Sequence, residues 1–316
     1  MPTKSKAAGK TKAPRKTEID VLRADSLSQI PWLLHGFSTR IGGVSKAYGG
    51  HALNLGFTAH DSRLAVDRNR QAFATAVAAK PGARKAAKNQ AASWPLITLR
   101  QVHSDLIHCV SGVIPKPLAG DGLITASPGI LLAVLMADCL PIIVVDTKRQ
   151  AVGVFHAGWR GTVKRIVEKG VGEMRRHFGS RPSDLKAVIG PGIRGCCYQV
   201  GTEVRAAFES QFSYGSRLFR VTKETDEIHE KYPLLFLTSR APGHSELPEQ
   251  IFLDLAEANR RQLLDAGLSA KNISEIALCT ACRADILFSH RAEHGVTGRM
   301  MAVAGILHAG SAPRKL

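Results

Sequence analysis

The chain lacks any apolar run near the length of about 20 residues that a membrane-spanning helix needs. Its first residues are polar and basic, without the apolar segment of a secretory signal, so we expect no secretory leader. With only 6 cysteines in 316 residues, the sequence does not describe a small disulfide scaffold. These absences favour a protein of the reducing cytoplasm with no membrane partner.

Acidic residues are also scarce, because 26 Asp and Glu stand against 43 Lys and Arg, a formal net charge of +17. Part of this excess lies before the first acid, Glu18, in a segment dominated by Ala, Gly, Pro, Lys and Thr. We predict that residues 1–20 form a disordered basic tail that contacts polyanions weakly. The chain lacks the aromatic-rich basic motifs of nucleic-acid-binding folds, so no specific nucleic acid partner is expected.

What the chain does contain is an irregular alternation of short apolar runs and helical patterns. Buried strands are expected at 94–99, 129–138, 150–155, 185–189, 271–278 and 299–307. Apolar residues at helical spacing predict helices over 61–79, 162–178 and 253–267. No linker interrupts this pattern, so we predict one α+β domain over residues 21–316.

Two histidines and a cysteine lie at the ends of three of the expected strands. His103 follows the first, Cys139 the second and His156 the third, each in a short polar or glycine-containing motif. Imidazole and thiolate are the natural ligands of zinc, and three protein ligands with an open fourth position are typical of a catalytic ion. We therefore predict a catalytic metal centre on these three residues.

The remaining cysteine motifs point less clearly to one chemistry. Cys279 and Cys282 form a Cys-x-x-Cys pair, which suits a redox couple or half of a zinc site. Upstream, 244–246 reads His-Ser-Glu, an incomplete version of the zinc deaminase pattern, in which a proline precedes the first cysteine. Cys196 and Cys197 are adjacent, which is more typical of a turn than of metal ligands.

An ordered set of short motifs resembles the laccase-domain family, once called multicopper polyphenol oxidases and now described as purine nucleoside phosphorylases. The resemblance runs from about Ile30 to Ile306. Its motifs are Phe37–Ser45, Leu53–Gly56, Gln101–Ser104, Asp121–Gly122, Ala137–Ile142, His156–Gly161, Gly190–Pro191 with Cys197–Val200, Cys279–Cys282 and Thr297–Met300.

The resemblance implies a layered α/β/β/α domain similar to a bacterial toxin deamidase, with Zn²⁺, or alternatively Cu²⁺, on His103, Cys139 and His156. It implies phosphorolysis of adenosine, inosine and methylthioadenosine, together with adenosine deamination. Purine nucleoside and phosphate are thus the expected partners. Some bacterial members are associated instead with editing peptidoglycan precursors.

Phosphorolysis requires a bound phosphate, and Arg40 and Arg160 are the candidate anion ligands. Asn54 and Gln101 are candidate substrate contacts, although turn chemistry explains Arg40 and Asn54 equally well. The family usually carries a histidine where this chain has Thr58. His60 is a possible substitute.

Two other functions stay open at this point. A copper oxidase of phenols has two His and one Cys in its favour, but the 12 histidines are scattered and no axial Met lies next to Cys139. A thiol hydrolase would use Cys139 as nucleophile and His156 as base, and would act without metal. Such an enzyme would suit amide bonds of cell-wall precursors.

Overall fold

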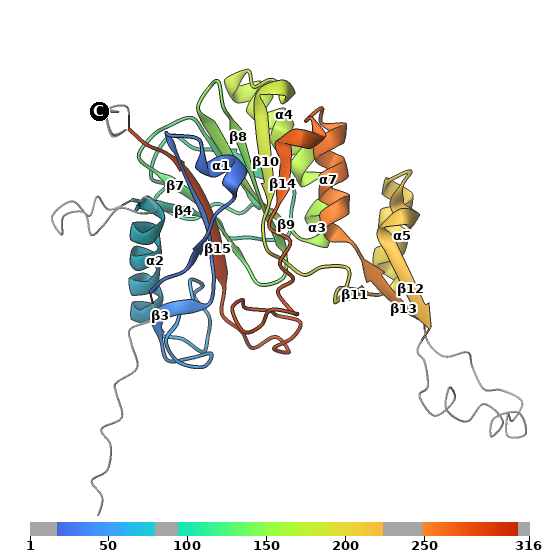
Figure 1. Ribbon diagram of the computed structural model, residues 1–316, viewed down its shortest axis with the longest axis horizontal. Coiled ribbons are helices and arrows are strands. Elements are labelled where there is room, and N and C mark those ends of the chain that lie inside the picture. The colour runs from blue at the N-terminus through green and yellow to red at the C-terminus, as the bar shows by residue number, and fades with distance from the viewer. Residues whose placement is uncertain (1–17, 80–93, 224–248, 309–316) are drawn as a thin grey trace, which may run out of the picture.

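Two β-sheets packed face to face form the centre of the computed structural model, which describes residues 18–79, 94–223 and 249–308 (Figure 1). The first sheet has the strand order β1 (Val21–Leu22), β2 (Leu33–Ser38), β15 (Met300–Ile306), β7 (Leu131–Met136) and β4 (Leu96–Thr98). The second has the order β14 (Ile273–Glu275), β10 (Leu185–Ile189), β8 (Leu140–Asp146), β9 (Ala151–Ala157), β6 (Gly122–Thr125) and β5 (Ile107–Cys109).

Alternation along the strands divides the core into three clusters. On β7, Leu132 and Val134 face the second sheet and pack with Val152 and Val154 of β9. The intervening Leu131 and Ala133 face the other way, into a separate cluster that a helix covers. Because successive side chains of a strand point to opposite faces, one apolar run serves both layers.

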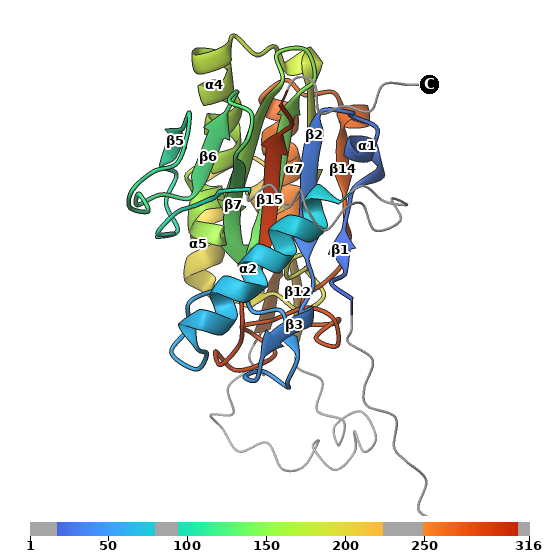
Figure 2. The ribbon, with the colours of Figure 1, turned by 90° about the vertical axis from the view of Figure 1, so that its left-hand side faces the viewer.

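Helices cover the two outer faces of the paired sheets. The helix α2 (Arg63–Ala78) packs Phe73 and Val77 on the first sheet, whereas α3 (Trp159–Val163), α4 (Ile166–Phe178) and α7 (Leu255–Asp265) cover the second (Figure 2). The layers therefore run helix, sheet, sheet, helix, which confirms the fold predicted from the sequence. No helix among the described residues is both long and apolar enough to cross a membrane.

Smaller elements complete the described chain. A three-stranded sheet of β11 (Gln199–Val200), β13 (Glu249–Leu253) and β12 (Phe219–Lys223) lies to one side with α5 (Thr202–Gln211) (Figure 1). The helix α1 (Asp25–Ser28) precedes β2, and β3 (Ile41–Ser45) follows it. Residues 1–17 and the His-Ser-Glu motif at 244–246 lie outside the described residues.

The helix expected over 162–178 is two helices, so that prediction was wrong in its detail. Arg165 adopts φ 62°, a left-handed conformation that ends α3 and starts α4 anew. Thr162 therefore lies inside α3 instead of capping a helix, and Gly158 occupies the N-cap position. By contrast, Ser62 caps α2 as expected, because its hydroxyl accepts a hydrogen bond from the Ala65 amide at 3.1 Å.

Two glycines of α4 provide a test of the helix–sheet packing. A Cβ on Gly170 would lie 2.4 Å from Cζ of Phe155, whereas one on Gly172 would meet no atom within 4 Å. We expect Gly170→Ala to lower the free energy of unfolding by about 1–3 kcal/mol through overpacking. The matched control, Gly172→Ala, should raise it by up to about 1 kcal/mol through helix propensity. Urea unfolding measures both, and equal effects of the two substitutions would contradict this packing.

Candidate metal centre

His103, Cys139 and His156 converge on one point at the ends of the two central strands of the second sheet. Their ligand atoms all lie within 4.8 Å of one another. Sγ of Cys139 is 3.8 Å from Nε2 of His103, and the two imidazole rings are 5.0 Å apart in an edge-to-face arrangement. His156 lies within β9 and Cys139 immediately before β8, so adjacent paired strands carry two of the three side chains.

A buried carboxylate, Asp121, holds two of these residues together. Its Oδ1 accepts a hydrogen bond from Nδ1 of His156 at 2.8 Å and one from the backbone amide of His103 at 3.1 Å. Its Oδ2 accepts from the amides of Val102 and Ser104 and from the Ser104 hydroxyl. The bond to Nδ1 leaves Nε2 of His156 free, which is the arrangement of a metal-ligating histidine and its carboxylate partner.

A second buried carboxylate, Asp138, fixes the residue before Cys139. Its backbone has φ 98°, which is unusual for a residue with a Cβ. Hydrogen bonds from the hydroxyls of Thr280 (2.6 Å) and Ser289 (2.8 Å) and from the amide of Arg291 (2.7 Å) occupy its oxygens. Contacts with a distant part of the chain therefore stabilise the turn that presents Cys139.

Gly158 leaves the space in which the three ligands meet. A Cβ at this position would lie 2.9 Å from Sγ of Cys139 and 3.0 Å from Cδ2 of His103. Only a residue without a side chain permits both to approach the backbone of α3 so closely. The donor set, its carboxylate support and this space together fit a zinc-type ion.

The charges of the centre are strongly coupled. Burial by itself raises the pKa of Cys139, but the imidazoles of His156 and His103 outweigh it and lower that pKa to about 6. Burial likewise disfavours protonated His156, yet Cys139 and Asp121 raise its pKa to about 9. For Asp121 the effect of burial is outweighed by hydrogen bonds from His156 and Ser104, so its pKa lies well below its usual range. Without metal, a thiolate therefore faces an imidazolium at neutral pH.

The centre forms one wall of a cavity of about 720 Å³. Of the other predicted site residues, Gln101 and Arg160 also line this cavity. The Gln101 amide is held by the backbone of Leu135, through bonds of 2.8 Å to its carbonyl and 2.7 Å from its amide. The guanidinium of Arg160 lies over the Trp159 ring, 4.4 Å from its centroid. It makes no ion pair within the part of the chain that the structure describes.

Arg40 and Asn54 are not among the residues that line the cavity. The Arg40 guanidinium pairs with Glu293 at 3.1 Å, donates to the carbonyl of Ala284 and lies over the Phe288 ring. Asn54 is fully buried, and its amide bonds to neighbouring groups that include Gly56 and the Arg299 amide. Turn chemistry therefore accounts for the Asn54–Gly56 bonds only, whereas Arg40 is held by long-range contacts with residues 284–293. The structure does not bring either residue to the cavity wall.

Several residues that shape the site were not predicted from the sequence. Asp121 appears there only as part of the Asp121–Gly122 motif, with no role of its own. Its position directly before a strand is a signal that could have singled it out. Arg291, Arg299, His290 and Tyr198 also line the cavity. They come from loops far along the chain, and no local pattern indicates where such loops fold. Thr58 and His60 both reach the cavity wall as well.

Two histidines and a cysteine at a cavity wall of a four-layered α/β/β/α domain are the features expected of a laccase-like domain. Comparison with protein families agrees with this class. The family model described as "Multi-copper polyphenol oxidoreductase laccase" matches residues 34–307, and the chain belongs to this family.

Similar proteins carry names that concern nucleosides. The chain is 32% identical over 287 residues to purine nucleoside phosphorylase YlmD of Bacillus subtilis, covering 88% of this chain and 90% of that protein. It is 35% identical over 295 residues to a purine nucleoside phosphorylase of Deinococcus radiodurans, covering 91% and 93%. The crystal structure of YlmD from Geobacillus stearothermophilus superposes with a TM-score of 0.70 at 31% identity, over 94% of this chain and 98% of that one.

Zinc binding by the metal-free centre should strengthen as pH rises. Binding requires a thiolate and neutral imidazoles. The pKa is about 6 for Cys139 and about 9 for His156. Between pH 6 and pH 9, zinc binding therefore displaces one proton from this pair, namely the proton on His156. The apparent affinity should therefore rise about tenfold per pH unit in this window. Calorimetry in buffers of different ionisation enthalpy counts the released proton, and an affinity independent of pH would contradict the coupled pair.

Gly158→Ala should weaken zinc binding at least about tenfold, the scale of effect expected when ligand positioning is disturbed. The reason is the overlap of the new methyl group with Cys139 and His103. Gly112→Ala is the matched control, because a Cβ there would meet no atom within 4 Å. Competition with a chelating dye measures both affinities. Unchanged affinity in the Gly158 variant would show that the ligands do not need this space.

Proposed function

We propose that the chain is a zinc-dependent purine nucleoside phosphorylase that acts on adenosine, inosine and methylthioadenosine. The observation that carries this proposal is the position of the His103, Cys139 and His156 donor set on the wall of a 720 Å³ cavity. Arg160 lines the same cavity and has no ion-pair partner among the residues that the structure describes. The names of the relatives support the reaction, and the cavity lies within the 300–1,000 Å³ range typical of small-molecule sites.

His103, Cys139 and His156 would hold the ion, and Asp121 orients His156 toward it. When bound, the ion supplies a positive charge that polarises a substrate oxygen or activates water. In phosphorolysis a phosphate oxygen attacks C1′ of the sugar while the bond from C1′ to the base breaks. The base leaves with the bonding electrons and takes up a proton. The chain must therefore hold phosphate on one face of the ribose.

Arg160 is the proposed phosphate ligand. Its position on the cavity wall and its freedom from carboxylate partners among the described residues leave the guanidinium able to bind an anion through two N–H groups. Arg291 lines the same wall, but its Nη1 already donates to the carbonyl of Gln199 at 2.8 Å. Arg299 is likewise held by the carbonyls of Thr297 and Gly298.

The remaining residues of the cavity wall are proposed to bind the nucleoside. Phe57 and Tyr198 provide aromatic surface for a purine ring. Thr58, which stands where the family usually has a histidine, bonds to the hydroxyl of Tyr48 at 2.6 Å, while His60 lines the cavity beside it. Gln101 lines the same cavity as the three metal-ligand candidates, and we keep it as a candidate substrate contact. The selectivity of the enzyme among nucleosides would then depend on this region.

Adenosine deamination is a second candidate activity of the same centre. A protein named adenosine deaminase RL5, from an unidentified prokaryote, is 36% identical over 171 residues, covering 54% of this chain and 56% of that protein. Replacement of the purine amino group by water needs the same cavity and the same ion, without phosphate.

The metal-independent thiol hydrolase has one specific observation in its favour. The lowered pKa of Cys139, about 6, and the raised pKa of His156, about 9, describe a thiolate nucleophile beside an imidazolium that has taken up its proton. A multicopper oxidase has less support, because the described residues contain only two groups able to hold a metal ion, and only one of them includes histidine.

Product analysis with adenosine separates these reactions. We expect adenine release that requires phosphate and zinc and is abolished by His103→Ala. Inosine formed without phosphate, and lost on zinc removal, would establish deamination. Activity that survives complete removal of metal but not alkylation of Cys139 would replace the proposal with the thiol hydrolase.

Arg160→Gln should raise the KM for phosphate about 10- to 100-fold, the loss expected for charge-assisted hydrogen bonds. The KM for nucleoside should change much less, because the substitution leaves the aromatic surface intact. Arg68→Gln on the exposed face of α2 is the matched control and should change neither constant. Initial rates at varied phosphate measure the effect. Equal changes of both KM values would remove Arg160 from the phosphate site.

A further inference from the structure

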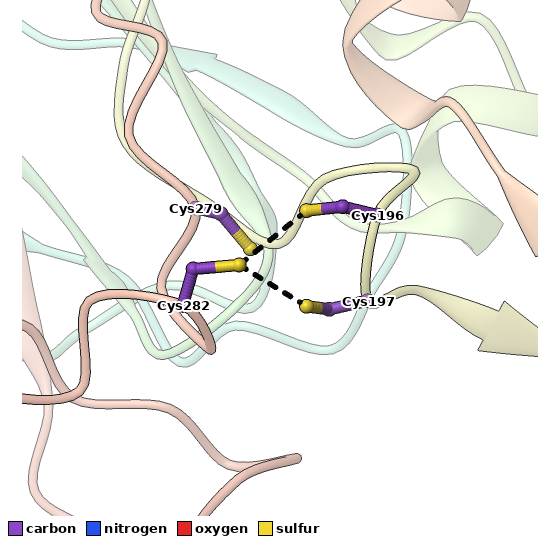
Figure 3. A group of neighbouring side chains, drawn as sticks. All are labelled: Cys196, Cys197, Cys279 and Cys282. Carbon is purple, nitrogen blue, oxygen red and sulfur yellow. Dashed lines mark hydrogen bonds between the residues drawn. The ribbon is translucent and has the colours of Figure 1, made fainter.

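We propose that the chain holds a second metal ion, a structural Zn²⁺ bound by the four thiolates of Cys196, Cys197, Cys279 and Cys282. Figure 3 shows these side chains pointing toward one another from two segments that are far apart in the sequence. The site is separate from the His103, Cys139 and His156 centre, and neither the family model nor the names of the relatives assign it.

The spacing of the four sulfurs fits one ion. All lie within 4.8 Å of one another, and Sγ of Cys282 is 3.6 Å from that of Cys196 and 3.3 Å from that of Cys197. A tetrahedral zinc with bonds of about 2.3 Å has sulfur–sulfur edges of about 3.8 Å. These separations are far longer than a disulfide bond of about 2.05 Å. Four sulfurs grouped in this way match the coordination shell of a single tetrathiolate ion.

Backbone contacts hold the two cysteine segments side by side. Gly192 and Cys279 form a parallel β-bridge, with the Gly192 amide donating to the Leu278 carbonyl at 3.2 Å. The Thr280 amide donates in turn to the Gly192 carbonyl at 3.1 Å. Cys196 and Cys197 lie in a turn, as their adjacency predicted, and both sulfurs lie near that of Cys282. The proposal therefore departs from the expectation that a turn explains these two cysteines better than metal binding does.

The surroundings stabilise negative charge on the sulfur of Cys279, the most buried of the four cysteines. Backbone amides of Arg194, Ala281 and Cys282 are directed at the Cys279 sulfur. The positive charge of Arg194 also lies close enough to Cys196 and Cys279 to interact with both. Four thiolates on one Zn²⁺ carry a net charge of −2, and such N–H groups and a nearby cation offset it.

The chemistry of the donors selects the ion and its role. Soft thiolates favour zinc over magnesium, calcium or manganese. Four protein ligands leave no position for substrate, which is the pattern of a structural site. Of the six cysteines, Cys139 belongs to the first centre and only Cys109 belongs to neither.

The proposed ion would link two segments that contact the cavity wall, one through Tyr198 and the other through Asp138. Tyr198 follows Cys197 directly and lines the cavity. Thr280, between the other two ligands, donates its hydroxyl to Asp138, the neighbour of Cys139. Loss of the second ion should therefore loosen the turn that presents Cys139, and weaken the first centre indirectly.

Metal counting on the purified full chain tests the proposal. Mass spectrometry should find two zinc ions per chain in the wild type, and two in Cys109→Ser, the matched control. His103→Ala should retain one ion, and X-ray absorption of that variant should show zinc surrounded by sulfur alone at about 2.3 Å. Since only the second ion remains in this variant, the result does not depend on the proposed enzymatic activity.

Cys282→Ser should lose the ion that His103→Ala retains, and Cys282→Ser combined with His103→Ala should bind none. If the serine variant fails to fold, absorption by His103→Ala still decides the question. One zinc per wild-type chain that disappears in His103→Ala would overturn the proposal. So would a disulfide among the four cysteines in protein purified under reducing conditions, detected as a mass loss of about 2 Da per bond.

Discussion

The geometry of the candidate metal centre depends on the buried carboxylate of Asp121. Five hydrogen bonds converge on its two oxygens, from three consecutive amides, one hydroxyl and the Nδ1 of His156. A carboxylate in the interior is tolerable only because these donors replace its water. The bonds also join the loop that carries His103 to the strand that carries His156. The same contacts therefore compensate the charge of Asp121 and align the two histidines.

Asp138 plays the corresponding part for the cysteine ligand, but through residues from the other end of the chain. Thr280, Ser289 and Arg291 all donate to it, and each belongs to the segment between β14 and β15. That segment contributes Arg291 and Arg299 to the cavity and two of the four clustered cysteines. This long irregular segment therefore connects the cavity wall to the turn before Cys139.

Strand and helix periodicity predicted a single α+β domain, and short polar motifs singled out the three residues that converge, because both are local signals. The layered arrangement was expected only from the family resemblance that these motifs carry. The sequence could not predict which loops share a cavity wall. Arg40 and Arg160 both stand beside glycines, yet only Arg160 lines the cavity, because Glu293 and the Phe288 ring hold Arg40. The break at Arg165 was missed for a related reason. Arg165 has a left-handed backbone, and its side chain contacts Glu168, Gln211 and Phe212. Helix propensity does not take tertiary contacts such as those with Gln211 and Phe212 into account.

The central place of β15 in the first sheet has a consequence for synthesis on the ribosome. Residues 300–306 pair with β2 on one side and β7 on the other, so they fill the gap between strands made much earlier. Until they emerge, both neighbours expose unpaired backbone and an apolar face. The first sheet can therefore close only in a late, non-local step, after residues 300–306 have been synthesised.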